Sequence, residues 1–351
     1  MPLRPLYGHE GTRNRLAGAV ASGRLPQAIL LEGPKGVGKQ RLALWLGQLL
    51  LCTDPTKSGP CGSCSNCRMA LSLQHPDLHW FVPVEPSKKG ADADKQVDLV
   101  EEALGEITAE RREQPLYEAP SGLARHGVAS VRLLLRRLHL TPAMAQRKTF
   151  IVGDAERLIP QQGTEAAANA ILKALEEPPA DSTFVLTAAE PEALLPTILS
   201  RVVRVRLARL PDTVVASFAQ QELDLDEKGQ NQRPTVASAD GCIGKLLALY
   251  RSRGIEHGED AALAALRGER TGRLAFALRQ QTYQARGGFT AMLDGLLVRL
   301  RSEARTRDDW KGAHQLVAAI ARVLEFRDLA QRNVNPQLLA AVLSDDLAET
   351  A

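Results

Sequence analysis

The stretch that decides the fold is PQAILLEGPKGVGKQRLALWLGQLLLC, which runs from Pro26 to Cys52. A short apolar run, Ala28–Leu31, predicts a buried strand, and the leucines that follow the next turn recur at helical spacing. The turn between them fits G-x-x-x-x-G-K, a pattern whose backbone N–H groups and lysine cradle phosphates at the start of a helix. The alternative is a glycine-rich turn that only joins a strand to a helix. The candidate phosphate-binding residues are Gly33, Gly36, Gly38 and Lys39.

Working outward, two more apolar runs, Thr149–Val152 and Thr183–Thr187, predict buried strands. The alanine-rich stretch between them, Glu165–Glu177, predicts a helix that ends before Pro178, because proline disfavours helix in the residue before it. Strands that alternate with helices indicate a parallel α/β sheet with helices on both faces. After Leu210 the apolar spacing becomes almost purely helical, at Leu246–Tyr250, Met292–Leu300 and Leu316–Leu324.

These patterns predict three domains. An α/β domain covers about residues 1–206, a small helical domain 207–255, and an all-α domain 256–351. A polar stretch at 85–127 holds ten acidic and six basic residues, and we expect it to be a solvated excursion of loops with one exposed helix over about 97–112.

The composition excludes several classes of protein. The 351 residues include 44 Lys+Arg and 41 Asp+Glu, a net charge of +3, which is too small for a protein whose main task is to wrap DNA. No apolar run approaches the ~18 residues of a membrane span, and the amino-terminal MPLRPLYGHE lacks the apolar core of a signal peptide. We therefore expect a cytoplasmic protein, in which clustered cysteines hold a metal rather than form disulfides.

A cysteine cluster over residues 52–67 has the pattern C-x8-C-x2-C-x2-C. Four thiolates bind Zn²⁺ in a tetrahedron, and a site with no open position is structural rather than catalytic. The alternative is reduced cysteines without metal, or a redox dithiol. The fifth cysteine, Cys242, stands alone and is expected to be a small buried residue. The predicted zinc ligands are Cys52, Cys61, Cys64 and Cys67.

Two positions depart from the pattern of ATP-hydrolysing proteins with this loop. Gln40 follows the loop lysine, where a Ser or Thr hydroxyl would bind Mg²⁺. Gly153 and Asp154 follow the second predicted strand, where such enzymes carry Asp and Glu. ATP or ADP can still dock on Lys39 and the loop amides, whereas metal-assisted hydrolysis is not expected. For Asp154 the alternative is a carboxylate that caps the next turn.

As a set, several motifs resemble the clamp-loader branch of the AAA+ ATPases in its bacterial DNA polymerase III form. They extend over nearly the whole chain, except the polar stretch and much of the helical third. The stretches that carry the resemblance are YGHE (Tyr7–Glu10), SGRLPQAILLEGPKGVGK (Ser22–Lys39), PCGSCSNC and HPD (Pro60–Cys67, His75–Asp77), ANAILKALEEPP (Ala168–Pro179), SRV (Ser200–Val202) and NVNPQLL (Asn333–Leu339).

The resemblance implies an AAA+ core with a zinc module at 52–67, a helical lid at 207–255 and a helical collar at 256–351 that joins a ring of subunits. It also implies a place in a DNA-directed DNA polymerase holoenzyme. The implied partners are ATPase subunits of the gamma/tau type and a delta subunit, and through the complex primed DNA and the sliding clamp.

In that family a Ser-Arg-Cys triplet supplies an arginine finger to the ATP site of the neighbouring subunit. Here Ser200 and Arg201 match, and Val202 replaces the cysteine. The resemblance implies that Arg201 acts in trans, a role that suits the fixed charge and fork geometry of a guanidinium. By spacing alone Arg201 is a surface arginine at a strand entry, like the nearby Arg204 and Arg206.

The same resemblance places Thr187 at a polar sensor position, although a threonine on a strand needs no such role. With Gln40, Thr187 completes the candidate nucleotide-binding residues. Gly244, beside Lys245, stands where the ATPase subunits carry a sensor arginine. The leading hypothesis is therefore a non-hydrolysing clamp-loader subunit. One alternative is an active gamma/tau-type ATPase or another AAA+ motor, for which Ser or Thr, Asp and Arg are expected at positions 40, 153 and 244. The other is a zinc-containing nucleic-acid-binding module, against which the near-neutral charge argues.

Overall fold

The structure is a computed structural model that describes residues 3–85, 92–114, 124–158, 165–223, 236–251, 270–279, 289–307, 309–330 and 334–350. The chain forms two compact units. The first unit is Met1–Lys228 with Asp240–Lys245, and the second is Gly229–Ala239 with Leu246–Ala351. The finer division into three domains at 206 and 255 stays a prediction.

The first unit is built on a five-stranded, wholly parallel sheet in the order β2-β3-β4-β1-β5. Three of its strands confirm the predicted ones, and every residue in these three is buried, as expected for central strands covered on both faces. The sequence does not predict the two edge strands, because both are short and neither consists of a continuous apolar run. The strands are β1 (Ala28–Glu32), β2 (Leu78–Phe81), β3 (Lys148–Val152), β4 (Ser182–Ala188) and β5 (Val203–Arg206).

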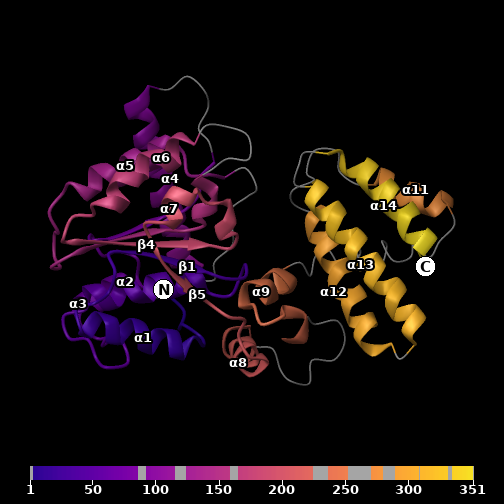
Figure 1. Cartoon of the computed structure of the whole chain (residues 1–351), viewed down its shortest axis with the longest axis horizontal. Coiled ribbons are helices and arrows are strands. Elements are labelled where there is room, and N and C mark those ends of the chain that lie inside the picture. The colour runs from indigo at the N-terminus through magenta and orange to yellow at the C-terminus, as the bar shows by residue number, and fades with distance from the viewer. Residues whose placement is uncertain are drawn as a thin grey trace. The chain divides into compact units, whose positions relative to one another are not determined.

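Helices cover both faces of this sheet, as predicted (Figure 1). One face carries α1 (Glu10–Ala21), α2 (Lys39–Leu51) and α3 (Ser65–Leu71). The other face carries α4 (Ala93–Glu113), α5 (Val128–Leu138), α6 (Ala166–Glu176) and α7 (Pro196–Leu199). Short 3₁₀ turns, η1 (Ala155–Leu158) and η2 (Pro191–Ala193), follow β3 and β4.

The described part of the polar stretch is more ordered than predicted. Helix α4 is longer than the expected 97–112, and it buries Val97, Val100 and Leu104 while packing against α5. Ion pairs join the two helices on the outside, Arg136 to Asp94 at 2.5 Å and Arg137 to Glu101 at 2.6 Å. The many charged residues lie on the outer face of α4, while its inner face is buried. The expectation of a solvated, exposed helix is therefore wrong for α4. Residues 86–91 and 115–123 lie outside the described part.

Beyond the sheet, α8 (Asp212–Leu223) and the segment Asp240–Lys245 also belong to the first unit. The Leu210 N–H donates to the Gly241 carbonyl at 2.9 Å, which ties the segment to the chain that leads into α8. The 3₁₀ turn η3 (Val236–Ala239) precedes this segment, and α9 (Ile243–Arg251) begins within it. Cys242 is buried there, as predicted.

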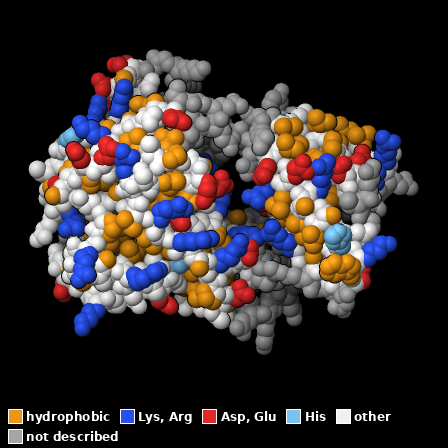
Figure 2. Space-filling model, viewed as in Figure 1, with side chains coloured by type: hydrophobic (Ala, Val, Ile, Leu, Met, Phe, Trp, Pro, Cys, Tyr) orange, Lys and Arg blue, Asp and Glu red, His pale blue; other side chains and the backbone are white. Residues whose placement is uncertain are grey.

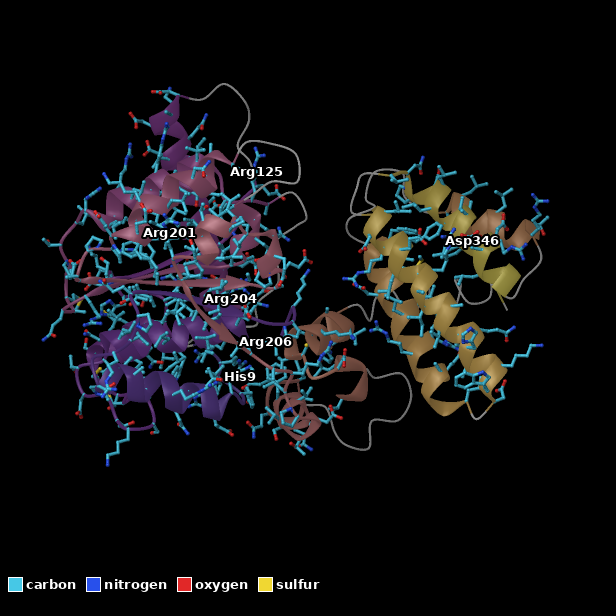
Figure 3. The ribbon with its side chains drawn as sticks, viewed as in Figure 1. His9, Arg125, Arg201, Arg204, Arg206 and Asp346 are labelled. Carbon is cyan, nitrogen blue, oxygen red and sulfur yellow. The ribbon has the colours of Figure 1, made fainter. Side chains whose placement is uncertain are left out.

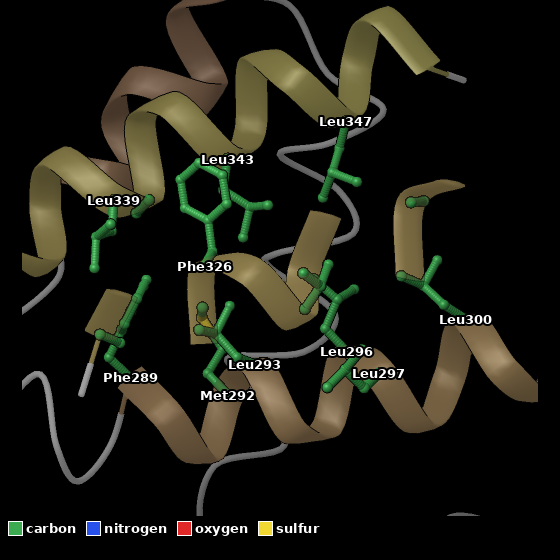
Figure 4. Close-up of a cluster of buried hydrophobic side chains, with 14 of the residues drawn as sticks. Phe289, Met292, Leu293, Leu296, Leu297, Leu300, Phe326, Leu339, Leu343 and Leu347 are labelled. Atoms are coloured by element: carbon green, nitrogen blue, oxygen red, sulfur yellow. The ribbon is translucent and has the colours of Figure 1, made fainter. Parts of the chain in front are cut away.

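The described residues of the carboxyl-terminal third are helical, as predicted, in α11 (Arg270–Leu278), α12 (Thr290–Thr306), α13 (Trp310–Ala330) and α14 (Pro336–Thr350). Helix α13 packs against α12 and α14, and α14 also packs against α11. Figure 4 shows the core between them, where Leu293, Phe326 and Leu343 meet. Val317 fits the helical spacing but is 56% exposed, because it faces away from this core. No helix in the described ranges is both long and apolar enough to cross a membrane.

Candidate functional site

The glycine-rich loop joins the carboxyl end of β1 to the first residue of α2, Lys39. At Gly33 the backbone has φ 151°, and a Cβ there would lie 2.5 Å from the Leu207 carbonyl oxygen, so only glycine fits. Gly38 caps α2 in the left-handed conformation, with φ 107°. The predicted strand, loop and helix are therefore present, with backbone N–H groups at a helix start.

The lysine of this loop is turned inward. Lys39 is buried, and its ammonium donates to the Gly33 carbonyl at 2.8 Å and to the Pro34 carbonyl at 2.9 Å. Burial lowers the pKa of Lys39, and the nearby carboxylates of Glu156 and Asp154 partly offset this effect. The loop's own carbonyls thus accept two of the three N–H groups of the ammonium, so Lys39 can offer a phosphate at most one N–H unless these contacts break.

Gln40 and Gly153, the two departures from the hydrolytic pattern, lie against each other. The Gln40 Oε1 accepts a hydrogen bond from the Trp80 indole N–H at 3.2 Å. A Cβ built at Gly153 would lie only 2.8 Å from both Cδ and Oε1 of Gln40. The carboxamide thus fills the space that a side chain at position 153 needs. A carboxylate cannot be added at position 153 unless Gln40 moves.

The turn after β3 is fixed by two buried side chains. The Asp154 N–H donates to the Thr187 hydroxyl at 3.0 Å, so this hydroxyl ties β4 to the turn. The Nε2 atom of His126 lies 2.7 Å from the Gly153 carbonyl oxygen. Burial lowers the pKa of His126 to about 4, although its hydrogen bond to Gly153 opposes the shift. Neither residue contributes a charge to the site at neutral pH.

The start of α9 covers the phosphate loop directly. The Gly244 N–H donates to the Gly36 carbonyl at 2.8 Å, and a Cβ at Gly244 would lie 2.6 Å from the Gly36 Cα. No side chain fits at position 244 without a backbone shift. The close contact between the backbones of Gly244 and Gly36 therefore excludes an arginine at the sensor position. The Lys245 ammonium lies 4.0 Å from an Asp240 carboxylate oxygen.

A segment at the amino terminus also reaches the loop. His9 has a left-handed backbone, with φ 58°, and its Nε2 atom lies 2.9 Å from the Val37 carbonyl oxygen. Tyr7 donates to the Glu222 carboxylate of α8 at 2.8 Å. The sequence analysis assigned no role to His9, Trp80 or His126. Only the YGHE motif marked His9, and its spacing does not reveal a contact 28 residues further on.

Arg201 lies one residue beyond α7's carboxyl-terminal cap, away from the residues described above. Its Nη1 donates to the Thr197 carbonyl at 2.8 Å and to the Ser200 hydroxyl at 3.2 Å, and its Nη2 contacts the Glu176 carboxylate at the end of α6. The neighbouring Arg204 pairs instead with Glu32 of β1, at 2.6 Å. Figure 3 shows Arg201 on the α6–α7 side of the unit, with Arg204 and Arg206 in β5. In the same view, Lys and Arg side chains are prominent on the surface of the unit (Figure 2).

The four clustered cysteines converge. All four Sγ atoms lie within 4.8 Å of one another, with Cys61 to Cys67 at 3.9 Å and Cys52 to Cys64 at 4.0 Å. Tetrahedral Zn²⁺ with bonds of ~2.3 Å requires sulfur–sulfur distances of about 3.8 Å. Gly59 packs on Trp45 of α2, where a Cβ would lie 2.7 Å from the indole. The residues present therefore fit a structural zinc ion.

Backbone N–H groups point at the sulfurs of the cluster. The N–H of Cys64 donates to Cys61 at 3.4 Å, and the N–H of Cys67 donates to Cys64 at 3.3 Å. Burial raises the pKa of Cys64, but hydrogen bonds from Thr53 and Cys67 outweigh burial and lower the pKa to about 6. Burial raises the pKa of Cys67. Donors of this kind stabilise the thiolate form, which is the form that binds metal.

A parallel sheet with helices on both faces, a phosphate-loop pattern at the end of β1 and a helical carboxyl-terminal region define an α/β protein of the P-loop type. The family model described as "DNA polymerase III, delta subunit" matches residues 8–211. This match covers more than half of the chain, and the chain belongs to this family.

Three relatives illustrate the similarity. The chain is 28% identical to the DNA polymerase III subunit delta' of Escherichia coli, over 68% of this chain and 58% of that protein. It is 31% identical to the subunit gamma/tau of Mycobacterium bovis, over 56% of this chain and 27% of that protein. It is 27% identical to the subunit tau of Salmonella typhimurium, over 98% of this chain and 45% of that protein. The matched regions span less than two thirds of each relative's own length.

Proposed function

We propose that the chain is a delta-prime-type subunit of a DNA polymerase III clamp loader that does not hydrolyse ATP. The packing of Gln40 against Gly153 carries the proposal. A Mg²⁺ site needs a hydroxyl at position 40 and a carboxylate at position 153. Here the Gln40 carboxamide stands in place of the hydroxyl and occupies the space that a carboxylate at position 153 needs. The inward Lys39 and the contact between Gly36 and Gly244 support the same conclusion.

In this role Arg201 acts in trans as an arginine finger on a nucleotide held by a neighbouring ATPase subunit. An arginine finger accelerates phosphoryl transfer by about 10³-fold or more. The partners in the proposal are gamma/tau-type and delta subunits, and the complex loads the sliding clamp on primed DNA in the cytoplasm. Cys52, Cys61, Cys64 and Cys67 would hold a structural Zn²⁺, which supplies folding energy to residues 52–67 and no reaction step.

The second candidate is an active gamma/tau-type ATPase. The matches to gamma/tau and tau relatives favour it, since the tau match extends over 98% of this chain. The intact phosphate-loop glycines and Lys39 also favour it. The two candidates differ in one measurable property, which is ATP turnover by the isolated chain.

The test combines the isolated chain with a reconstituted complex. We expect the purified chain to show no ATP turnover above background, and Gln40→Thr alone not to restore turnover. Steady hydrolysis by the wild-type chain that Lys39→Ala abolishes would identify the motor instead.

In a complex with its ATPase partners, Arg201→Ala should lower DNA-dependent ATP turnover and clamp loading while assembly continues. Arg201→Lys should recover little activity, because an ammonium cannot reproduce the bidentate fork. Arg206→Ala is the matched control, since Arg206 is an exposed arginine near Arg201 in the sequence, and it should remain close to wild type. The finger assignment would be wrong if Arg201→Ala loaded clamps at the wild-type rate, or if its only defect were lost association.

A further inference from the structure

The Arg201 guanidinium is almost fully engaged by its own chain. A guanidinium has five N–H donors. Two of them, on Nη1, bind the Thr197 carbonyl and the Ser200 hydroxyl, and one on Nη2 binds the Glu176 carboxylate. The fourth, on Nε, is buried and has no hydrogen-bond partner among the described residues. At most one N–H therefore remains for a ligand outside the chain.

A guanidinium holds a phosphate best through two parallel N–H groups on one edge. In the observed pose the edge formed by Nη1 and Nη2 faces residues of α6 and α7. The other edge includes the buried Nε. The pose is thus incompatible with bidentate binding of a phosphate on a neighbouring subunit, and Arg201 has to leave at least one of its present contacts to act in trans.

The contact with Glu176 is the one that an anion can replace. Glu176 is the last residue of α6, and the helix ends there because Pro178 and Pro179 follow. The carboxylate lies at a helix carboxyl terminus, where a negative charge is unfavourable and a cation beside it compensates. A phosphate offers the same kind of charged acceptor to the guanidinium, whereas a backbone carbonyl does not.

We propose that the ion pair with Glu176 holds Arg201 against its own chain, and we call this contact the latch. Phosphate groups of a nucleotide on a partner subunit displace Glu176 when Arg201 acts as the arginine finger. This inference rests on the proposed function for the identity of the incoming anion. The side chains of Arg201 and Glu176 are 28% and 46% exposed, respectively. Pairs this exposed bind weakly, so the latch holds the finger in the free chain without preventing its release.

The first experiment uses the free full-length chain and an arginine-selective dicarbonyl reagent, phenylglyoxal. The modification rate of each arginine is followed by peptide mass spectrometry. Removing the latch by Glu176→Ala should speed modification of Arg201 about two- to fivefold, the range expected for an exposed ion pair. Glu176→Gln should give a smaller increase, because a carboxamide still accepts a hydrogen bond.

The adjacent Glu177 provides the matched control, since it is exposed and bears the same charge at the next position. Glu177→Ala should leave the rate at Arg201 unchanged, and Arg206 in the same samples reports any general loosening of the fold. Equal rates at Arg201 in the wild-type and Glu176→Ala chains would overturn the latch.

The second experiment measures ATP turnover in the complex with the ATPase partners at limiting ATP. Glu176→Ala should raise turnover about two- to fivefold. The double variant Glu176→Ala/Arg201→Ala should match Arg201→Ala alone, because Glu176 acts only through Arg201. A loss of turnover in Glu176→Ala would show that Glu176 holds the finger in its productive pose and would refute the latch.

The two experiments separate the latch from the proposed function. If Arg201→Ala leaves turnover unchanged while Glu176→Ala still speeds modification of Arg201, the finger assignment fails and the intramolecular latch stands. If Arg201→Ala abolishes stimulation but Glu176→Ala changes neither rate, the finger stands and the latch fails.

Discussion

The phosphate loop carries the G-x-x-x-x-G-K pattern and the cysteine cluster carries four cysteines at metal-ligand spacing, but their surroundings differ. In the cluster, four sulfurs approach one another within 4.8 Å and receive backbone N–H groups, so the ligand atoms converge. In the loop, Lys39 binds the loop's own carbonyls and Gln40 fills the space beside Gly153. In the cluster the ligand atoms face one another, whereas in the loop the chain's own groups occupy the space and the donors that a ligand would use.

This contrast shows that a sequence motif predicts the backbone conformation of a segment more reliably than the ligand that the segment binds. The glycines of the loop produce the expected turn whether or not a metal binds, because glycine adopts the backbone conformations that the turn requires. Metal binding at the loop depends also on Trp80 of β2 and on which residue stands at position 153 after β3, and both lie far away in the sequence. The four cysteines lie within residues 52–67, so their convergence needs only local turns.

Loss of one zinc ligand should have the largest effect. We expect the wild-type chain to carry about one Zn²⁺, and Cys64→Ser to lower this to about a tenth of an equivalent or less, with a fall in thermal midpoint, because metal binding is part of folding. Elemental analysis and thermal unfolding measure both. The control is Cys242→Ser, which makes the same change at a buried cysteine outside the cluster. A wild-type sample without zinc, whose thiols titrate freely, would remove the contrast between the two regions.

Acid should weaken the phosphate-loop region through His126. Its pKa is about 4 in the folded chain and about 6.5 when unfolded, so the native state binds fewer protons. The stabilisation is present above pH 6.5 and is lost as the pH falls towards 4, by about 3 kcal/mol. Denaturant unfolding between pH 7 and pH 4.5 measures the slope, and His126→Gln should reduce it. An unchanged slope in this variant would locate the acid sensitivity elsewhere, for example at His79, whose pKa burial also lowers to about 4.

An intermediate effect is expected where Gln40 meets Gly153. Gly153→Asp alone should destabilise the chain by about 0.5–1.5 kcal/mol, because the carboxamide of Gln40 has to move and give up its hydrogen bond from the Trp80 indole. Adding Gln40→Thr removes the obstruction, so the double variant should recover part of the lost stability. A double-mutant cycle by chemical denaturation measures this coupling. Strictly additive effects would show that the two positions do not exclude each other.

The smallest effect on stability is expected at Arg201. Because its ion pair with Glu176 is partly exposed, Arg201→Ala should leave the thermal midpoint close to that of the wild type. Differential scanning fluorimetry of Arg201→Ala beside Arg206→Ala, a change at an exposed arginine, tests this. A large fall confined to Arg201→Ala would make this arginine a structural element of the α6–α7 contact.

The sequence by itself determined the elements whose signal is local. Apolar runs marked β1, β3 and β4, helical spacing marked the carboxyl-terminal helices, and cysteine spacing marked the four sulfurs that converge, because each of these patterns lies within a few residues. It missed β5, whose exposed Val-Arg alternation at the sheet edge shows no buried run. It also misjudged α4, since the charges of the outer face conceal the buried Val97, Val100 and Leu104.

Only the tertiary structure decided how these elements meet. The parallel order β2-β3-β4-β1-β5 brings Trp80, Gln40 and Gly153 together from three parts of the chain. The same folding places Glu176 beside Arg201 and His9 beside Val37. Spacing along the chain contains no information on such contacts, because crossover connections, not periodicity, set which strand ends and helix ends become neighbours.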